Sequence, residues 1–388
     1  MIFRYFCILF FSVLTALPLD LKVSARSAIL MNADTGAILY EKHAHIPAYP
    51  ASITKIATAA FILDDKSPSL DQMVTVSKES LRYKSLNGEV EPHWLETDGT
   101  RMGLKKGEIL SLEALLHGLM LVSGNDAANV LAESISGSVP QFVREMNLYV
   151  RELGCSNTQF CNPHGLHHPE HFTTAYDICL ITKRALQIPK FREIVSRTSY
   201  WKAKTNKQGP QELKQKNPLI KPGKHFYSRA FGVKTGYTSA AMNTLVAAAE
   251  DGGRTLIAVV LGCEKRTDRY EDVIRLFEAA FQEQKEERRF FGREHLFSRE
   301  VEGAKVPLRA VLDSDLVISY YPAEEPTCRA FVWWEPSHLP VRKGEKVGEV
   351  RICDEKGVLL QKKDLLAKED LKGTFFFILK EAVLKLFR

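Results

Sequence analysis

The chain has 388 residues, of which 45% are hydrophobic and 26% are charged, and its formal net charge is +6. A chain of this length is too long to fold around one ordinary hydrophobic core, so we expect about two domains. Its composition excludes a disordered protein. The small basic excess has no zinc-finger spacing or basic arm beside it, so we expect no nucleic-acid partner. It suits an anionic membrane surface or wall polymer.

Residues 1–25 are predicted to be a secretory signal peptide. Arg4 comes before an apolar run over residues 5–19, and the small residues Ser24 and Ala25 offer one cleavage site. An uncleaved membrane anchor is the alternative, although the run is short for a bilayer span. In both cases the body of the protein is exported. Six of the seven cysteines lie beyond this segment, too few for a disulfide framework, and their spacing matches no metal site.

The next region is predicted to contain a hairpin, a run of helices and three strands. The hairpin covers residues 27–44, and helices are expected from residue 52, over 110–121, after the turn at 123–125, and over 140–154 and 172–186. Strand-like segments follow at 230–236, 243–250 and 254–263, and a helix over 269–282 closes the region. Because strands at both ends flank a helical middle, they can share one sheet with helices packed over it.

Beyond a charged stretch at residues 286–295, strand signals dominate and predict a small all-β domain over 289–370. The last segment, 371–388, differs from it. On a helical wheel, one face collects the residues Phe375, Phe376, Leu379, Ala382, Val383, Leu386 and Phe387, and the opposite face collects Lys380, Glu381, Lys385 and Arg388. This pattern predicts an amphipathic helix lying on a membrane surface, with a terminal helix packed on the β-domain as the alternative.

Three short motifs occur in the order Ser52-Ile53-Thr54-Lys55, Ser123-Gly124-Asn125 and Lys234-Thr235-Gly236. Taken alone, the first motif indicates a helix N-terminus, because serine is a good N-cap and a proline stands close before it. The other two arise readily by chance, and an ordinary turn is the alternative for the second. Their joint occurrence in this order favours a serine nucleophile with a lysine one helical turn away as its base.

The chain resembles the serine D-alanyl-D-alanine carboxypeptidases, which are low-molecular-mass penicillin-binding proteins. The likeness extends to the longer stretches "SGNDAAN", "NPHGLHHPEHFTTAYD" and "GVKTGYT", to the β-rich tail and to the terminal amphipathic segment. It implies an α+β fold: a transpeptidase-like catalytic domain over residues 26–288, with a five-stranded antiparallel sheet, a helical cluster and the active site between them.

The resemblance also implies a role for each motif residue. Ser52 is the nucleophile, Lys55 its general base, and Ser123 a proton relay to the leaving amine. Lys55 can act only when neutral, and both burial and the second cation, Lys234, lower a lysine pKa. Substrate contacts are expected from the residues Asn125, Lys234, Thr235, Gly236 and Tyr237, with the backbone N–H groups of Ser52 and Tyr237 as the oxyanion hole.

Two arginines and four histidines remain open at this point. Arg269 falls where the resemblance puts a carboxylate-binding arginine, but the local sequence "CEKRTDRYED" departs from the family pattern, so Arg266 or a plain surface arginine is the alternative. His164 is expected to shape the loop near the site. The nearby His167, His168 and His171 resemble a metal cluster but are expected to be exposed loop histidines, so we predict no metal and no cofactor.

The sequence thus predicts a DD-carboxypeptidase that trims peptidoglycan stem pentapeptides and is acylated by β-lactams. It would be exported and held peripherally at the periplasmic face of the cytoplasmic membrane. A β-lactamase is the first alternative, although Glu170 lacks the context of a deacylating glutamate. A non-enzymatic penicillin-binding sensor is the second, and a cross-link-cutting endopeptidase is a closer variant.

Overall fold

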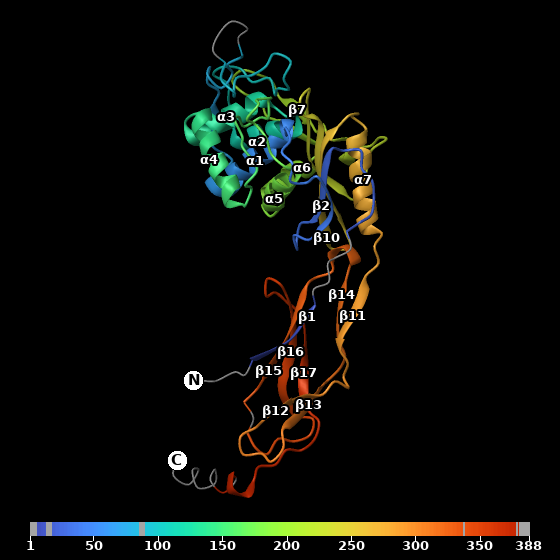
Figure 1. Ribbon diagram of the computed structural model, residues 1–388. Coiled ribbons are helices and arrows are strands. Elements are labelled where there is room, and N and C mark those ends of the chain that lie inside the picture. Colours follow the sequence, from blue (N-terminus) through green and yellow to red (C-terminus); the bar gives the residue numbers. More distant parts are fainter. Residues whose placement is uncertain (1–5, 13–17, 85–89, 337, 378, 380–388) are drawn as a thin grey trace. The chain divides into compact units, whose positions relative to one another are not determined.

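The computed structural model describes residues 6–12, 18–84, 90–336, 338–377 and 379 (Figure 1). They form two compact units. One covers Pro18–Gln282, and the other combines the chain from Glu283 onwards with the N-terminal strand β1 (Phe6–Ser12). The boundary lies before residue 288 because β11 (Glu286–Phe291) pairs with β14 (Leu316–Tyr320) of the second unit.

The first unit contains a five-stranded antiparallel sheet in the order β3-β2-β10-β9-β8. Its strands are β2 (Ser27–Asn32), β3 (Ile38–Lys42), β8 (Ala230–Thr238), β9 (Met242–Asp251) and β10 (Arg254–Cys263). The first and last strands of the unit meet in register, with Val259 opposite Ile29. The predicted α+β fold class, with terminal strands sharing one sheet, is therefore confirmed.

Helices cover both faces of this sheet (Figure 1). The cluster on one face contains α1 (Lys55–Phe61), α2 (Leu112–Leu121), α3 (Asn125–Ser136), α4 (Val139–Glu152), α5 (Ala175–Leu186) and α6 (Pro189–Ser196). The helix α7 (Asp268–Phe281) packs on β9 and β10 from the other face. Shorter elements are η1 (Ala51–Thr54), η2 (Ile62–Lys66), η3 (Pro218–Ile220), β4 (Met73–Thr75), β5 (Ile109–Ser111), β6 (Ser199–Lys202) and β7 (Gln211–Lys214).

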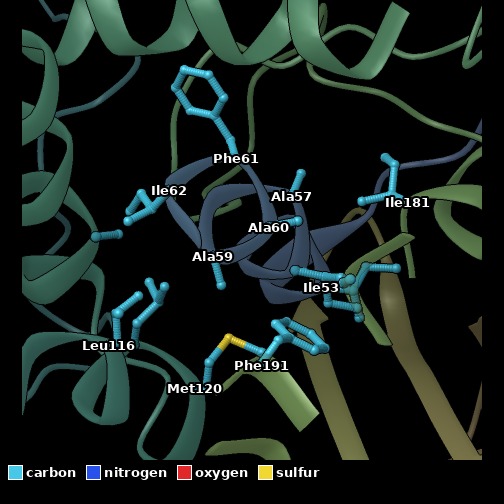
Figure 2. Close-up of a cluster of buried hydrophobic side chains, with 14 of the residues drawn as sticks. Ile53, Ala57, Ala59, Ala60, Phe61, Ile62, Leu116, Met120, Ile181 and Phe191 are labelled. Atoms are coloured by element: carbon cyan, nitrogen blue, oxygen red, sulfur yellow. The ribbon is translucent and has the colours of Figure 1, made fainter. Parts of the chain in front are cut away.

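The helix α1 lies in the centre of the cluster, and all seven of its residues are buried. Figure 2 shows it surrounded by side chains of the neighbouring helices, among them Leu116 and Met120 of α2 and Phe191 of α6. The small side chains of its alanines let the neighbouring helices pack closely against α1, and close packing without voids is what a protein interior requires. Ser52 does not begin this α-helix: it lies in the 3₁₀ turn η1, and the α-helix starts at Lys55.

Residues 19–25 lie inside the predicted signal peptide, yet they form hydrogen bonds with other parts of the first unit. The backbone N–H groups of Ser24 and Ala25 donate to the buried Asp272 carboxylate at 2.9 and 2.8 Å. The Lys42 ammonium donates to the carbonyl oxygens of Val23 and Ala25. A signal peptide that ended at Ala25 would remove both N–H donors from Asp272.

The second unit is built on a six-stranded sheet in the order β1-β15-β16-β17-β13-β12. Its other strands are β12 (Phe297–Arg299), β13 (Leu308–Leu312), β15 (Cys328–Trp334), β16 (Lys346–Asp354) and β17 (Leu359–Ala367), and η4 (Pro322–Glu324) is a single turn. The alternating burial along β15 places Ala330 and Val332 in an apolar core. This is the small β domain that the sequence predicts.

The chain end leaves this core. Residues 375–377 are helical, and the side chains of Phe375 and Phe376 are 73% and 82% exposed. Most of the predicted amphipathic face lies in residues 380–388, outside the described residues. Among the helices that the structure describes, none has the length and apolar character needed to cross a bilayer.

Candidate active site

A cleft of about 700 Å³ in the first unit contains most of the residues singled out from the sequence. They come from η1, from the turn before α3 and its first residue, from strand β8, and from α7 and the loop before it. The lining includes Ser52, Ser123, Asn125, Thr235, Gly236, Tyr237 and both candidate arginines, Arg266 and Arg269. Residues that are far apart in the chain, from Ser52 to Arg269, therefore meet at one edge of the sheet, next to the N-terminus of α1.

Lys55 lies beneath Ser52 and is completely buried. Its ammonium donates to the Ser52 hydroxyl at 3.1 Å, to Oδ1 of Asn125 at 2.7 Å and to the carbonyl oxygen of His164 at 2.6 Å. Burial, and then the neighbouring charge of Lys234, holds the pKa of Lys55 well below its ordinary value. A lysine in this setting releases its proton readily and can accept one from the serine.

Lys234 of β8 provides a second buried ammonium. It donates to the Ser123 hydroxyl and to the carbonyl oxygen of Thr235, both at 3.0 Å. Burial, followed by the charges of Lys216 and Arg269, lowers the pKa of Lys234 to about 7. The Ser123 hydroxyl thus contacts Lys234, and the described residues contain no hydrogen bond from it to Lys55.

A buried carboxylate sets the position of the second motif. Asp126, one residue into α3, accepts the backbone N–H groups of Met102, Gly103 and Leu104 at 2.8 to 3.0 Å. Ser123 has a left-handed backbone with φ of 64°, which a non-glycine residue adopts only when its surroundings enforce it. The hydroxyl of Thr100 donates to its carbonyl oxygen at 2.7 Å.

Strand β8 passes so close to η1 that position 236 has no room for a side chain. A Cβ atom on Gly236 would lie 3.0 Å from the backbone nitrogen of Ser52 and would collide with the Thr244 hydroxyl. Tyr237, next along the strand, leaves its side chain 63% exposed. Ser52 and Tyr237 both line the cleft at this close approach of β8 to η1.

The two candidate arginines differ in their surroundings. Arg269 is buried, and its guanidinium donates to the carbonyl oxygens of Gly236 at 2.8 Å and Thr244 at 3.2 Å. It thereby braces β8 against β9. Arg266 is exposed at the rim of the same cleft. Arg269 is therefore not a plain surface arginine, and that alternative from the sequence is wrong.

The histidine-rich loop lies against the back of the site. His164 is buried, and its ring bonds backbone atoms of His93 and Leu166, so its part is to shape the loop. His171 is not the exposed histidine that the sequence predicted. It is 2% exposed, Nδ1 accepts the N–H of Cys161 at 3.0 Å, and Nε2 lies 2.9 Å from the Thr54 hydroxyl.

Lys216 is a cleft residue that sequence reasoning missed. Its positive charge lowers the pKa of both Lys55 and Lys234, and its backbone N–H donates to the carbonyl oxygen of Leu121 at 3.1 Å. No signal singles it out, because it is one of several lysines in the stretch "LKQKNPLIK".

The antiparallel sheet with its helical cluster, together with a serine bonded to a buried lysine, defines the class: serine enzymes of the penicillin-binding fold. A family model described as D-alanyl-D-alanine carboxypeptidase, peptidase family S11, matches residues 14–265. The chain belongs to this family of serine hydrolases.

Named relatives agree with this assignment. The D-alanyl-D-alanine carboxypeptidase DacF of Bacillus subtilis is 30% identical over 374 residues, 92% of this chain and 88% of the relative. Penicillin-binding protein 5 of Haemophilus influenzae has a TM-score of 0.62 at 26% identity, covering 91% of this chain and 99% of that structure. The Streptomyces K15 DD-transpeptidase has a TM-score of 0.59 at 30% identity, covering 68% and 98%.

Proposed function

We propose that this chain is a serine DD-carboxypeptidase that removes the terminal D-alanine from peptidoglycan stem pentapeptides. The observation that carries the proposal is the buried Lys55 ammonium 3.1 Å from the Ser52 hydroxyl, with its pKa held low. Peptide bonds are poor electrophiles, so hydrolysis is divided into acylation of a serine and deacylation by water.

In acylation, Ser52 Oγ attacks the carbonyl carbon of the penultimate D-alanine and its proton passes to Lys55 Nζ. The carbon–nitrogen bond then breaks, and the departing D-alanine amine takes up a proton, for which the Ser123 hydroxyl is the proposed relay. Water next attacks the ester carbon, the bond from that carbon to Ser52 Oγ breaks, and Oγ takes up the proton that the water loses to Lys55 Nζ, while the shortened peptide leaves as its carboxylate. The amides of Ser52 and Tyr237 are proposed to stabilise the oxyanion in both steps.

The remaining cleft residues are proposed to bind and orient. Lys234 and Thr235 hold the terminal carboxylate, and Gly236 lets the substrate strand lie against β8. Asn125 positions Lys55 through its Oδ1 and presents its amide nitrogen to the substrate backbone. Arg269 supports the carboxylate site by fixing the carbonyl of Gly236, while the exposed Arg266 is the arginine free to reach the carboxylate itself.

A direct assay tests this function. The purified protein is incubated with diacetyl-L-Lys-D-Ala-D-Ala, and free D-alanine is measured. Release of D-alanine together with slow turnover of penicillin supports a carboxypeptidase. Fast penicillin turnover would favour a β-lactamase, but Glu170, the candidate deacylating base, is exposed and is not part of the cleft lining.

The pH dependence should depend on Lys234. Reaction needs Lys55 neutral and Lys234 charged, so a falling limb is expected near pH 7, where Lys234 loses its proton. Lys234→Met removes that limb. It also removes a positive charge that lowers the pKa of Lys55, so the rising limb should move to higher pH. Profiles of kcat/KM for both proteins measure this, and a variant profile with both limbs unmoved would contradict the role.

We further propose export and peripheral attachment to the periplasmic face of the cytoplasmic membrane. Residues 1–25 would contain the export signal. The 371–388 segment would lie in the membrane–water interface, with its phenylalanines towards the lipid interior and its basic residues towards anionic headgroups. The exposed Phe375 and Phe376 support this, because both leave the core of the β unit.

Deleting residues 371–388 should move the mature enzyme from the membrane fraction to the soluble fraction. D-alanine release from the small peptide should be retained, because the cleft lies wholly within the first unit. Fractionation of cells expressing each form measures the change. A truncated, signal-cleaved protein that still sediments with membranes would show that the attachment lies elsewhere.

A further inference from the structure

A cysteine, a histidine and a glutamate converge outside the cleft. One ligand atom each from Cys161, His168 and Glu170 lies within 4.8 Å of the other two. Within the described residues, this is the only group of three or more histidine, cysteine, aspartate or glutamate side chains arranged so closely. The linear spacing of 7 and 2 residues matches no familiar metal motif, so the sequence points to His168 as one of several loop histidines but not to Cys161 and Glu170 beside it.

The backbone explains how these residues meet. Gln159 and Phe172 exchange two backbone hydrogen bonds of 2.9 Å and close the loop at its base. Two further bonds fix its interior: the N–H of His171 donates to the carbonyl oxygen of His168 at 2.9 Å, and the N–H of Cys161 donates to the His171 ring. Cys161 and His168 are therefore held across a closed loop.

We propose that Cys161, His168 and Glu170 bind one Zn²⁺ ion. Thiolate, imidazole and carboxylate are the protein ligands that zinc uses, and three of them leave a fourth position for water. The thiolate disfavours Mg²⁺ and Ca²⁺, which prefer oxygen. Zinc binding releases the proton of the Cys161 thiol to solvent, and the thiolate and the carboxylate then carry two negative charges, matching a divalent cation.

The geometry leaves a short closing movement. Tetrahedral ligands about 2.0–2.3 Å from zinc stand roughly 3.5 Å apart, so atoms that lie within 4.8 Å of one another need to approach by at most about 1.3 Å. Glu170 is exposed, so its side chain has room to rotate towards Cys161. His168 is half-buried and its Nδ1 accepts the N–H of Glu170 at 3.2 Å, which leaves Nε2 as the ring nitrogen available to the ion. The two other loop histidines are engaged elsewhere: His171 with Thr54, and His167 with the ring of Tyr49.

The ion would act on the catalytic lysine through the loop. His164, whose carbonyl oxygen accepts the Lys55 ammonium, lies between Cys161 and His168 in the chain, and Gly165 and Leu166 line the cleft. Zinc bound at the base of this segment would hold that carbonyl in place. The metal site itself does not depend on the proposed function; only this consequence rests on it.

The test uses the mature full-length protein, stripped of metal by a chelator and titrated with Zn²⁺ by calorimetry. One ion per chain and a raised unfolding temperature are expected. Cys161→Ser and His168→Ala should each weaken binding by more than about a hundredfold, since even outer-shell changes cost up to that much. The matched controls Cys353→Ser, a half-buried thiol of the β unit, and His167→Ala should bind as the unchanged protein does.

Co²⁺ provides a spectroscopic check on the ligand set. Its thiolate absorption band in the near ultraviolet should be present in the Cys353→Ser protein and absent from the Cys161→Ser protein. Labelling by fluorescent penicillin shows that each variant is folded. Because labelling and zinc binding are measured separately, the test of the metal site is distinct from the test of the proposed function. Labelled protein that binds no Zn²⁺, or that binds it equally well after Cys161→Ser, would overturn the site.

Discussion

Ser52→Ala should abolish both covalent labelling by fluorescent penicillin and release of D-alanine. Loss of a serine nucleophile costs on the order of a million-fold in rate, because no other atom can form the acyl-enzyme. The Ser52 hydroxyl lies 3.1 Å from Nζ of Lys55, which is fully buried and has a strongly lowered pKa, so this lysine can accept the serine proton. The measurements are gel fluorescence after labelling and enzymatic detection of D-alanine.

Ser239→Ala is the matched control. Ser239 lines the same cleft but is exposed, and the described residues give it no hydrogen bond to a lysine. It should label and turn over substrate much as the unchanged protein does. The small loss of volume in Ser52→Ala leaves the fold intact, so thermal unfolding of the two variants should be similar. Persistent labelling of the Ser52→Ala protein would mean that another side chain is the nucleophile.

Lys55→Met should slow acylation by at least about a hundredfold while leaving the cleft able to bind penicillin. Methionine fills the space of the lysine stem inside α1 but cannot take the proton of Ser52 Oγ. Without that transfer the hydroxyl is a weak nucleophile. Single-turnover acylation rates and the binding constant of the initial complex separate the two effects.

The structure also predicts a cost of this substitution in stability. Asn125 Oδ1 and the His164 carbonyl lose the ammonium that they accept from, and a buried unpaired acceptor costs about 1–3 kcal/mol. Against this, removing a buried charge recovers its desolvation penalty. The unfolding temperature therefore serves as the control, and a folded Lys55→Met protein with an unchanged acylation rate would contradict the assignment of the base.

The sequence predicts the sheet well because its signals are local. The strand β10 is almost wholly apolar, and the turn at Asp251 and Gly252 joins it to β9 as expected. The pairing of β10 with β2, over 220 residues away, followed from the position of strands at both ends of a helical region. The Ser52 and Lys55 contact follows equally from one helical turn of spacing.

Contacts made by distant packing could not be predicted. Nothing local indicates that Asn125 accepts from Lys55 or that Ser123 contacts Lys234, because these pairs are 70 and 111 residues apart. His171 was misjudged for the same reason. A histidine that follows Pro169 and Glu170 in a polar stretch is expected to be exposed, and only the packing of the loop against Thr54 buries it.

The central claim is that Ser52 carries the acyl group, and locating that group tests it most directly. The mature protein is mixed with a slowly released β-lactam, digested, and mapped by tandem mass spectrometry. The account predicts one adduct per chain, on the peptide that contains Ser52, and none after Ser52→Ala. An adduct on Ser123 or on any other residue, or a protein that stays unmodified while it releases D-alanine, would contradict it.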